Sequence, residues 1–437
     1  MQTKIRVALI GASARGIYGF VQPLLKDYAD THELAGILDI SPQRMRIMNE
    51  FLGTRIPDFT SPEDLYSKAK PDLVIIATVD RTHFEYIEGA FKAQVNSIIE
   101  KPLCINAEQC RRILALQQAG RNVSAVTAHN YRYAPDMLHI KHLLDEGKIG
   151  ELRSIDFHEY LDQRHGASYF RRWNRRKKDS GGLVVHKASH CFDLMNWFAG
   201  ARAKSLFAKG SLNVYGSRAS AFRGEKCHTC KHTGQCPHYV DYASDLIKSQ
   251  ADLRTRLYFS DNSADRYTPD LCVYSPEIDI EDHITVGYDY ENGIQVTFEL
   301  CAYSSYEGIF IGLEGTRGRL EYQLMTGTKP GKDNADKYGS EITNLQSLRF
   351  YKFDGGMQVL EMPKREDQAH GGADWRMLKD LLGKPPHSDT AATLEDGVQA
   401  VLIGAAANES MATGKTVDVQ SLLKADPRLI FPDKQTL

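Results

Sequence analysis

The chain has 437 residues, of which 42% are hydrophobic and 25% charged, a composition that is ordinary for a globular protein and a length that suits two domains. Its net charge of -2 gives no reason to expect a nucleic-acid or membrane partner. The first strand pattern starts almost at the first residue, and no apolar run is long enough to cross a bilayer, so we expect no signal peptide and a cytoplasmic protein.

Residues 5–11 predict a buried parallel strand that runs into a glycine-bearing turn and then a helix. The turn, Gly11-Ala-Ser13-Ala-Arg-Gly16, is a dinucleotide-binding fingerprint whose middle glycine is replaced by serine. An ordinary strand-to-helix turn is the alternative. If the fingerprint is real, the pyrophosphate of a cofactor is held by Gly11, Ser13, Ala14, Arg15 and Gly16.

A second strand pattern, residues 33–39, ends in Asp39 at about the distance that the fingerprint requires. A carboxylate there accepts hydrogen bonds from the adenosine ribose and repels a 2′-phosphate, so we expect NAD. Ser41 and Arg44 lie close enough to keep NADP as an alternative. Asp39 is also a candidate cap for the helix that begins at Pro42, and both roles are compatible.

The strand–helix alternation continues, with strands over residues 73–77, 96–100 and 123–129 and helices from His83 and from about Asn106. Such alternation predicts a doubly wound parallel sheet, whose ligands lie beyond the carboxyl ends of the strands. Thr78, His83, Glu100 and Lys101 fall at or just past these ends, so we expect them at the cofactor. We place the boundary of this Rossmann domain at residue 130, which leaves 131–437 for a second domain.

Lys101 stands at the end of an apolar strand, where an amine can meet both cofactor and substrate. Oxidation of a secondary alcohol requires a group that takes the hydroxyl proton, and burial beside a cationic cofactor lowers the pKa of a lysine for this work. The segment 183–197 has a helical period that puts His186 and His190 on one face. We assign His190 as the acid/base with Lys101 assisting, and His186 as a substrate-binding or proton-relay residue.

The histidines and the basic segment before them have alternative interpretations. A single helix histidine is commonly a satisfied core or surface group, and a His-x-x-x-His pair can hold a metal, although no third ligand is evident. The basic segment 171–178 is either a solvated face or a loop that contacts the substrate. For the substrate reading, the expected contacts are Arg172 and Trp173, completed by Arg132 and Lys187.

An insert at about residues 222–245 carries three of the eight cysteines. Cys227, Cys230 and Cys236 have a spacing that indicates metal ligation in a cytosolic chain, and Cys272 is the expected fourth ligand of a structural zinc ion. A histidine as the fourth ligand, an iron–sulfur cluster and unligated thiols are the alternatives.

Several of these motifs, taken in order, resemble the Gfo/Idh/MocA oxidoreductase family, which includes glucose-fructose oxidoreductase and inositol dehydrogenase. The likeness spans nearly the whole chain and is carried by the Gly11–Gly16 loop, Asp39, Glu100-Lys101-Pro102, residues 130–135, Gly181-Gly182 to His190 and Asp193, and residues 395–397. The resemblance implies an α/β fold, in which the N-terminal Rossmann domain is followed by a C-terminal α/β domain with a large open, mostly antiparallel sheet. That sheet often mediates oligomerisation, so a homodimer or homotetramer is expected.

The resemblance also implies that Lys101 lies beside the nicotinamide and that the bond before Pro102 is cis. Family members commonly carry an aspartate where this chain has His186, so the fixed negative charge of that position is missing. The function so implied is NAD-dependent oxidation of a secondary hydroxyl of a sugar, glycoside or cyclitol. A redox-neutral glycosidase that retains NAD and a cofactor-sensing regulator are the alternatives; the presence of both Lys101 and His190 argues against the regulator.

Overall fold

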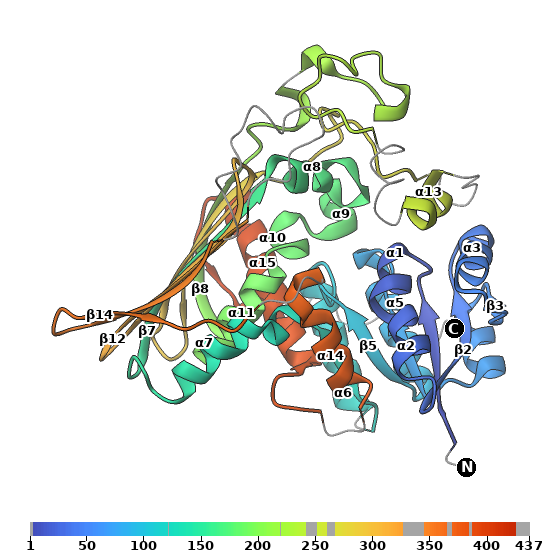
Figure 1. Cartoon of the computed structure of the whole chain (residues 1–437), viewed down its shortest axis with the longest axis horizontal. Coiled ribbons are helices and arrows are strands. Elements are labelled where there is room, and N and C mark those ends of the chain that lie inside the picture. Colours follow the sequence, from blue (N-terminus) through green and yellow to red (C-terminus); the bar gives the residue numbers. More distant parts are fainter. Residues whose placement is uncertain are drawn as a thin grey trace.

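The computed structural model describes residues 3–120, 122–218, 220–241, 251–259, 267–326, 345–364, 369–383 and 387–424. It contains two sheets, each with helices packed against it (Figure 1). In Figure 1 the blue N-terminal sheet lies to the right, and the larger sheet forms the left side of the molecule, with helices between them.

The first sheet is seven-stranded and doubly wound, in the order β15-β6-β5-β4-β1-β2-β3. Its strands are β1 (Ile5–Ile10), β2 (His32–Leu38), β3 (Asp58–Phe59), β4 (Leu73–Ile76), β5 (Asn96–Glu100), β6 (Ala125–Ala128) and β15 (Ala392–Thr393). All neighbours are parallel except β15, which pairs antiparallel with β6. The predicted Rossmann sheet is therefore confirmed. The division at residue 130 stays a prediction, to which the structure adds that residues 392–393 return to the first sheet.

The helices of this half follow the predicted alternation. They are α1 (Ala14–Gly16), which continues through residues 17–21 into α2 (Gln22–Asp27), then α3 (Pro42–Leu52), α4 (Pro62–Asp64), α5 (His83–Ala93) and α6 (Ala107–Ala119). Ser41, not Asp39, caps α3: its side chain accepts from the Arg44 N–H, and Pro42 stands at the first helical position. The predicted capping role of Asp39 is wrong, which leaves its carboxylate for the cofactor loop.

The second sheet is nine-stranded, in the order β14-β13-β12-β11-β7-β10-β9-β8-β16. Its strands are β7 (Leu152–Asp162), β8 (Ala203–Ser211), β9 (His283–Tyr290), β10 (Gln295–Ser304), β11 (Glu307–Gly315), β12 (Gly318–Thr326), β13 (Leu345–Lys352), β14 (Met357–Leu360) and β16 (Val417–Asp418). Only β7 and β10 pair in parallel, as expected for a mostly antiparallel sheet. Residues along its strands alternate between buried and exposed, as in β9, because one face packs on helices.

The helices between the sheets carry the chemistry-bearing side chains of the second half. They are α7 (Pro135–Asp145), α8 (Gln163–Arg171), α9 (Lys177–Ser180), α10 (Leu183–His186), α11 (Ser189–Ala199), α14 (Ala373–Leu381) and α15 (Leu394–Thr413). The single helix predicted over 183–197 is wrong, because α10 ends at His186 and α11 begins at Ser189. The N–H groups of Lys187 and Ala188 both donate to the Leu183 carbonyl, so the helical register slips there.

The connection between β8 and β9 is a long insertion, residues 212–282, that contains the cysteine segment and α13 (Ala251–Phe259). Figure 1 shows α13 above the Rossmann helices, and it packs against α3. Among the helices of the described ranges, we find none that is both long and apolar enough to span a membrane.

Candidate active site

A cavity of about 2160 Å³ runs from the Rossmann loop to helices α8–α11 and the insertion. Fifteen of the residues predicted for the site line it: Gly11, Ser13, Ala14, Arg15, Asp39, Arg44, Thr78, His83, Glu100, Lys101, Arg172, Trp173, His186, Lys187 and His190. Gly16 and Arg132 do not belong to this lining. The carboxyl ends of β1 and β4, where the strand order reverses, open into the cavity, as the doubly wound fold predicts.

The loop after β1 has no room for a side chain at its two glycines. Gly11 has φ +103°, and a Cβ at this position would lie 2.5 Å from the Ala77 carbonyl oxygen at the end of β4. A Cβ at Gly16 would lie 2.5 Å from the Gly11 oxygen. Ser13 caps the helix that follows, since its hydroxyl accepts from the Gly16 N–H at 3.1 Å. The backbone of this loop can therefore approach a phosphate closely.

Asp39 is fixed against the same loop. One carboxylate oxygen accepts from the Ala12 N–H at 2.8 Å, and the other accepts from the Ser41 N–H at 2.8 Å and lies 3.2 Å from the Arg44 guanidinium. Arg44, the residue that kept NADP as an alternative, is thus paired with Asp39. The acid is held at the end of β2, where the fingerprint requires it.

Arg15 and Glu100 form a bridge to the second half of the chain. The Arg15 guanidinium donates to Glu100 at 2.6 Å and, through two nitrogens at 3.0 Å each, to Asp374 in the first turn of α14. His83 is buried and contacts the Pro102 carbonyl at 2.8 Å through Nδ1. These three predicted cofactor residues shape the wall around Lys101.

Lys101 lines the cavity, and its amine donates to the His186 carbonyl at 3.2 Å. Burial lowers the pKa of Lys101 to about 8, although the negative charges of Glu100 and Asp80 oppose the shift. The bond between Lys101 and Pro102 is cis, as the resemblance implied. The pKa of this amine is thus close to neutral pH, where a group can both take and give a proton readily.

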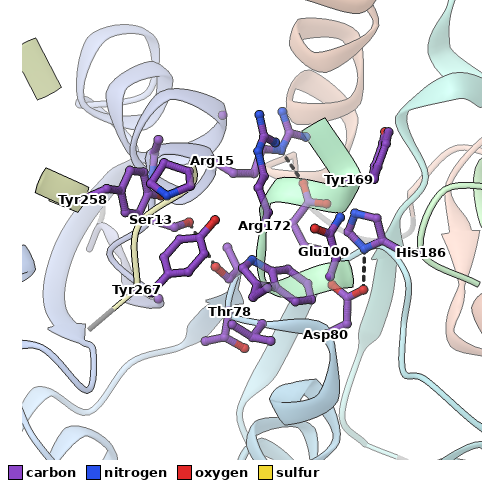
Figure 2. A pocket seen from close by; sticks show the side chains of 18 of the residues that line it. Ser13, Arg15, Thr78, Asp80, Glu100, Tyr169, Arg172, His186, Tyr258 and Tyr267 are labelled. Carbon is purple, nitrogen blue, oxygen red and sulfur yellow. Dashed lines mark hydrogen bonds and ion pairs between the residues drawn. The ribbon is translucent and has the colours of Figure 1, made fainter. Parts of the chain in front are cut away.

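Asp80 is a functional candidate that the sequence analysis missed. It is buried in the turn after β4, and its carboxylate lies 2.5 Å from His186 Nδ1, a contact drawn as a dashed line in Figure 2. Burial lowers the pKa of His186, and Asp80 partly offsets this. In the neutral ring, a proton on Nδ1 directed at Asp80 leaves Nε2 as an acceptor. The carboxylate missing at position 186 is therefore supplied from the Rossmann domain.

His190 lies beside this pair in a stacked arrangement with Tyr131, at 4.3 Å between ring centres. Lys187 does not present a lone charge to the cavity, because its amine lies 2.8 Å from Glu159 and 3.1 Å from the Tyr131 hydroxyl. Tyr131 thus joins His190 to a buried ion pair.

Another part of the wall comes from α8 and the residues after it. The Trp173 ring meets the His186 ring edge-on at 5.5 Å, and His165 pairs with Glu307 at 2.7 Å on the same lining. Arg132, predicted to bind substrate, is instead 2% exposed and bonds to Asp193 through two nitrogens, at 2.8 and 2.7 Å. The structure thus gives Arg132 a place in the core.

The four cysteines come together from two segments around a second, smaller cavity. Arg171 donates to the Cys227 sulfur at 3.2 Å, and the Gly224 N–H donates to the Cys272 sulfur at 3.4 Å. Within the described ranges, however, no group of three or more histidine, cysteine or acidic side chains is placed to hold a metal ion. The predicted zinc site is not supported by this arrangement; metal analysis of protein purified under reducing conditions tests it directly.

Two family models cover most of the chain. The model described as "Oxidoreductase family, NAD-binding Rossmann fold" matches residues 5–127, and the one described as "Oxidoreductase family, C-terminal alpha/beta domain" matches residues 141–419; both are Gfo/Idh/MocA models. Among curated proteins, YteT of Bacillus subtilis (strain 168), named as an oxidoreductase, is 32% identical over 96% of this chain and 98% of its own length. Myo-inositol 2-dehydrogenase of Thermotoga maritima is 25% identical over 47% of this chain and 59% of its own.

Solved structures share the whole fold at low identity. An oxidoreductase from Agrobacterium radiobacter in complex with NAD+, L-tartaric acid and magnesium has a TM-score of 0.63 at 17% identity, covering 96% of this chain and 100% of that one. Apo scyllo-inositol dehydrogenase from Lactobacillus casei has a TM-score of 0.62 at 17% identity, again covering 96% and 100%. At such identities the likeness establishes the fold alone.

Proposed function

The chain belongs to the Gfo/Idh/MocA family of NAD(P)-dependent oxidoreductases that act on CH–OH groups, and from this premise we propose that it oxidises a secondary hydroxyl of a sugar, glycoside or cyclitol with NAD. The observation that carries the proposal is the placement of Lys101 and both histidines on the cavity that also contains the phosphate loop and Asp39. A hydroxyl bound between them can lose its proton to the protein.

The residues present fit a dinucleotide. Side-chain atoms at Gly11 or Gly16 would fill the loop, and Asp39 stands at the end of β2, so the backbone of residues 11–15 would hold the pyrophosphate and Asp39 the adenosine ribose. When bound, the nicotinamide accepts a hydride from carbon. Arg44 pairs with Asp39, which favours NAD over NADP.

The proton is handled by the chain's own side chains. Lys101, with its pKa lowered to about 8, takes or shares the substrate hydroxyl proton with His190. His186, held through Nδ1 by Asp80, binds a neighbouring hydroxyl or relays the proton. Trp173, whose ring meets the His186 ring edge-on, would contact the sugar ring, and Arg172 lines the same cavity.

The test is to denature the purified protein and assay released cofactor, then to incubate native protein with cyclitols, free sugars and glycosides while following NADH absorbance and product mass together. Net NADH with a ketone product is the expected result. Cleaved glycoside with retained NAD and no net NADH replaces the dehydrogenase by a redox-neutral glycosidase. NAD binding with no conversion of any compound favours a cofactor sensor.

We further propose a cytoplasmic protein that forms a homodimer or homotetramer through its large sheet. Exposed apolar side chains on the strands of that sheet, Phe207, Leu345, Met357 and Val359, support the oligomer. Light scattering of the full chain tests it, and a monomeric mass at micromolar concentration would contradict it.

A further inference from the structure

The phosphate loop contacts a side chain from far along the chain. The hydroxyl of Tyr258, on α13 of the insertion, accepts the hydrogen bond of the Ala14 N–H at 3.1 Å. Ala14 is the first residue of α1, so its N–H has no acceptor within the helix. In a dinucleotide-binding loop such an N–H faces the pyrophosphate. The Tyr258 oxygen therefore stands where a phosphate oxygen would be bound.

Positive charge gathers around the same hydroxyl. Burial raises the pKa of Tyr258, and the cationic side chains of Arg44, Arg172 and Arg254 act in the opposite direction. These arginines come from α3, from the residue after α8 and from α13, and all three line the cavity. Arg44 is paired with Asp39, so Arg172 and Arg254 are the arginines that add positive charge near this hydroxyl, which suits an anionic ligand. Figure 2 shows Tyr258 beside Ser13, on the opposite side of the cavity from Asp80 and His186.

The helix that carries Tyr258 is fastened to the Rossmann domain. It packs against α3, the helix that follows Asp39, and Arg256 of α13 forms an ion pair with Glu50 of α3. The insertion thus reaches across the cavity and touches both the phosphate loop and the helix on the adenosine side. A dinucleotide lying along this path would be covered by α13.

We propose that Tyr258 is a cofactor-binding residue, that its hydroxyl accepts from the phosphate loop when the site is empty and donates to a phosphate oxygen when the dinucleotide is bound, and that α13 thereby retains the cofactor. A hydroxyl can take either role, because it has one donor and two acceptor positions. In the bound state the Tyr258 side chain withdraws from the Ala14 N–H, the phosphate oxygen accepts from that N–H, and the hydroxyl donates to the phosphate. This inference concerns cofactor binding and is independent of which hydroxyl compound is the substrate.

The first experiment measures the dissociation of NADH from wild type and Tyr258→Phe by stopped-flow fluorescence. Dissociation reports the bound state, in which the variant lacks a hydrogen bond to a charged group, so we expect a rate about tenfold faster. Tyr239→Phe, the same chemical change elsewhere in the insertion, is the matched control and should leave the rate unchanged. Equal rates in Tyr258→Phe and wild type would overturn the proposal.

The second experiment asks whether the phosphate is what the hydroxyl senses. ADP and adenosine are compared as competitors that displace NADH. Tyr258→Phe should weaken ADP by about tenfold and leave adenosine unchanged, since only ADP carries a diphosphate. An equal loss for both would mean that Tyr258 only supports the shape of the site, and would overturn the phosphate contact.

A third variant tests whether α13 retains the cofactor independently of the Tyr258 hydroxyl. Arg256→Gln removes the ion pair between α13 and α3 and leaves Tyr258 intact. We expect faster NADH dissociation, smaller in effect than that of Tyr258→Phe, because a partly exposed ion pair contributes little by itself. A melting curve of the cofactor-free variant checks that the fold is intact. No change in dissociation would refute the role of α13 as the retaining element.

Discussion

The two ends of the cavity are lined by different kinds of chemical group. We call the end around Lys101 the proton end and the end around Ser13 the phosphate end. Around Lys101 the wall consists of titratable side chains held in place by one another: the Lys101 amine on the His186 carbonyl and His186 on Asp80. Around Ser13 it consists of backbone N–H groups, glycines and the hydroxyls of Ser13 and Tyr258, with arginines nearby. The first arrangement can move a proton, and the second can only hold an anion. Substitutions at the two ends should therefore separate turnover from cofactor affinity.

Lys101→Ala is expected to separate turnover from cofactor affinity most strongly. Loss of the group that takes the hydroxyl proton should lower kcat by about 10³-fold with the substrate identified in the panel above. The affinity for NAD should stay close to wild type, because the loop and Asp39 are untouched. Steady-state kinetics and NADH titration check the two halves. An active Lys101→Ala variant would remove Lys101 from the proposed chemistry.

The corresponding substitution at the phosphate end is Gly11→Ala, which should lower cofactor affinity and spare turnover. The new Cβ would meet the Ala77 carbonyl at 2.5 Å with a backbone φ of +103°, so the loop must shift and NAD affinity should fall by about 100-fold. At saturating NAD, kcat should recover substantially. Gly53→Ala is the control, since Gly53 also has a positive φ but no atom within 4 Å of its Cβ position. A similar loss of affinity in both variants would indicate general destabilisation.

A smaller effect is expected for Asp80→Asn, which keeps the shape of the side chain and removes its charge. Turnover should fall by about tenfold, because His186 loses the partner that orients its ring. NAD affinity should not change. A matching fall for Asp64→Asn, a half-exposed acid that does not line the cavity, would contradict a specific role.

The smallest effect is a displacement of the pH profile. With a Lys101 pKa of about 8, kcat/KM should rise with pH through a midpoint near 8 as the amine becomes neutral. Asp80 raises this pKa, so Asp80→Asn should move the midpoint below 8. The profile is measured over pH 6 to 10 in both proteins. A midpoint that moves upward in the variant would place the titrating group elsewhere.

The phosphate end was largely predictable from sequence, because its signals are local. Gly11, Ser13 and Gly16 follow a recognisable strand, and Asp39 ends the next one, so spacing alone placed them. The fold was predictable for the same reason, since the period of the apolar residues marks each strand of the first sheet.

At the proton end, the sequence predicted most of the residues that line the cavity but not which side chains contact one another. The charge beside His186 comes from Asp80, 106 positions away. The same limit applies to one contact at the phosphate end, since the acceptor at Ala14 comes from Tyr258, 244 positions away. No periodicity links residues so distant in sequence. Polar residues just after β4 were a usable signal, and Thr78 was selected on it while Asp80 was not. Arg132 was assigned to the substrate because it belongs to the motif at residues 130–135. Its sequence position gave no sign that it would pair with Asp193 in the core.

The short strand β15 has a consequence for how the protein is made. It pairs residues 392–393 with the outer edge of β6, and these residues are synthesised long after β6, since Thr393 follows Thr127 by 266 positions. Until then the nascent N-terminal sheet displays an open strand edge, the kind of surface on which other chains pair and aggregate. The first sheet is therefore completed only after strands β7 to β14 of the second sheet have been synthesised, and a fragment that ends at residue 130 would keep the edge of β6 unpaired.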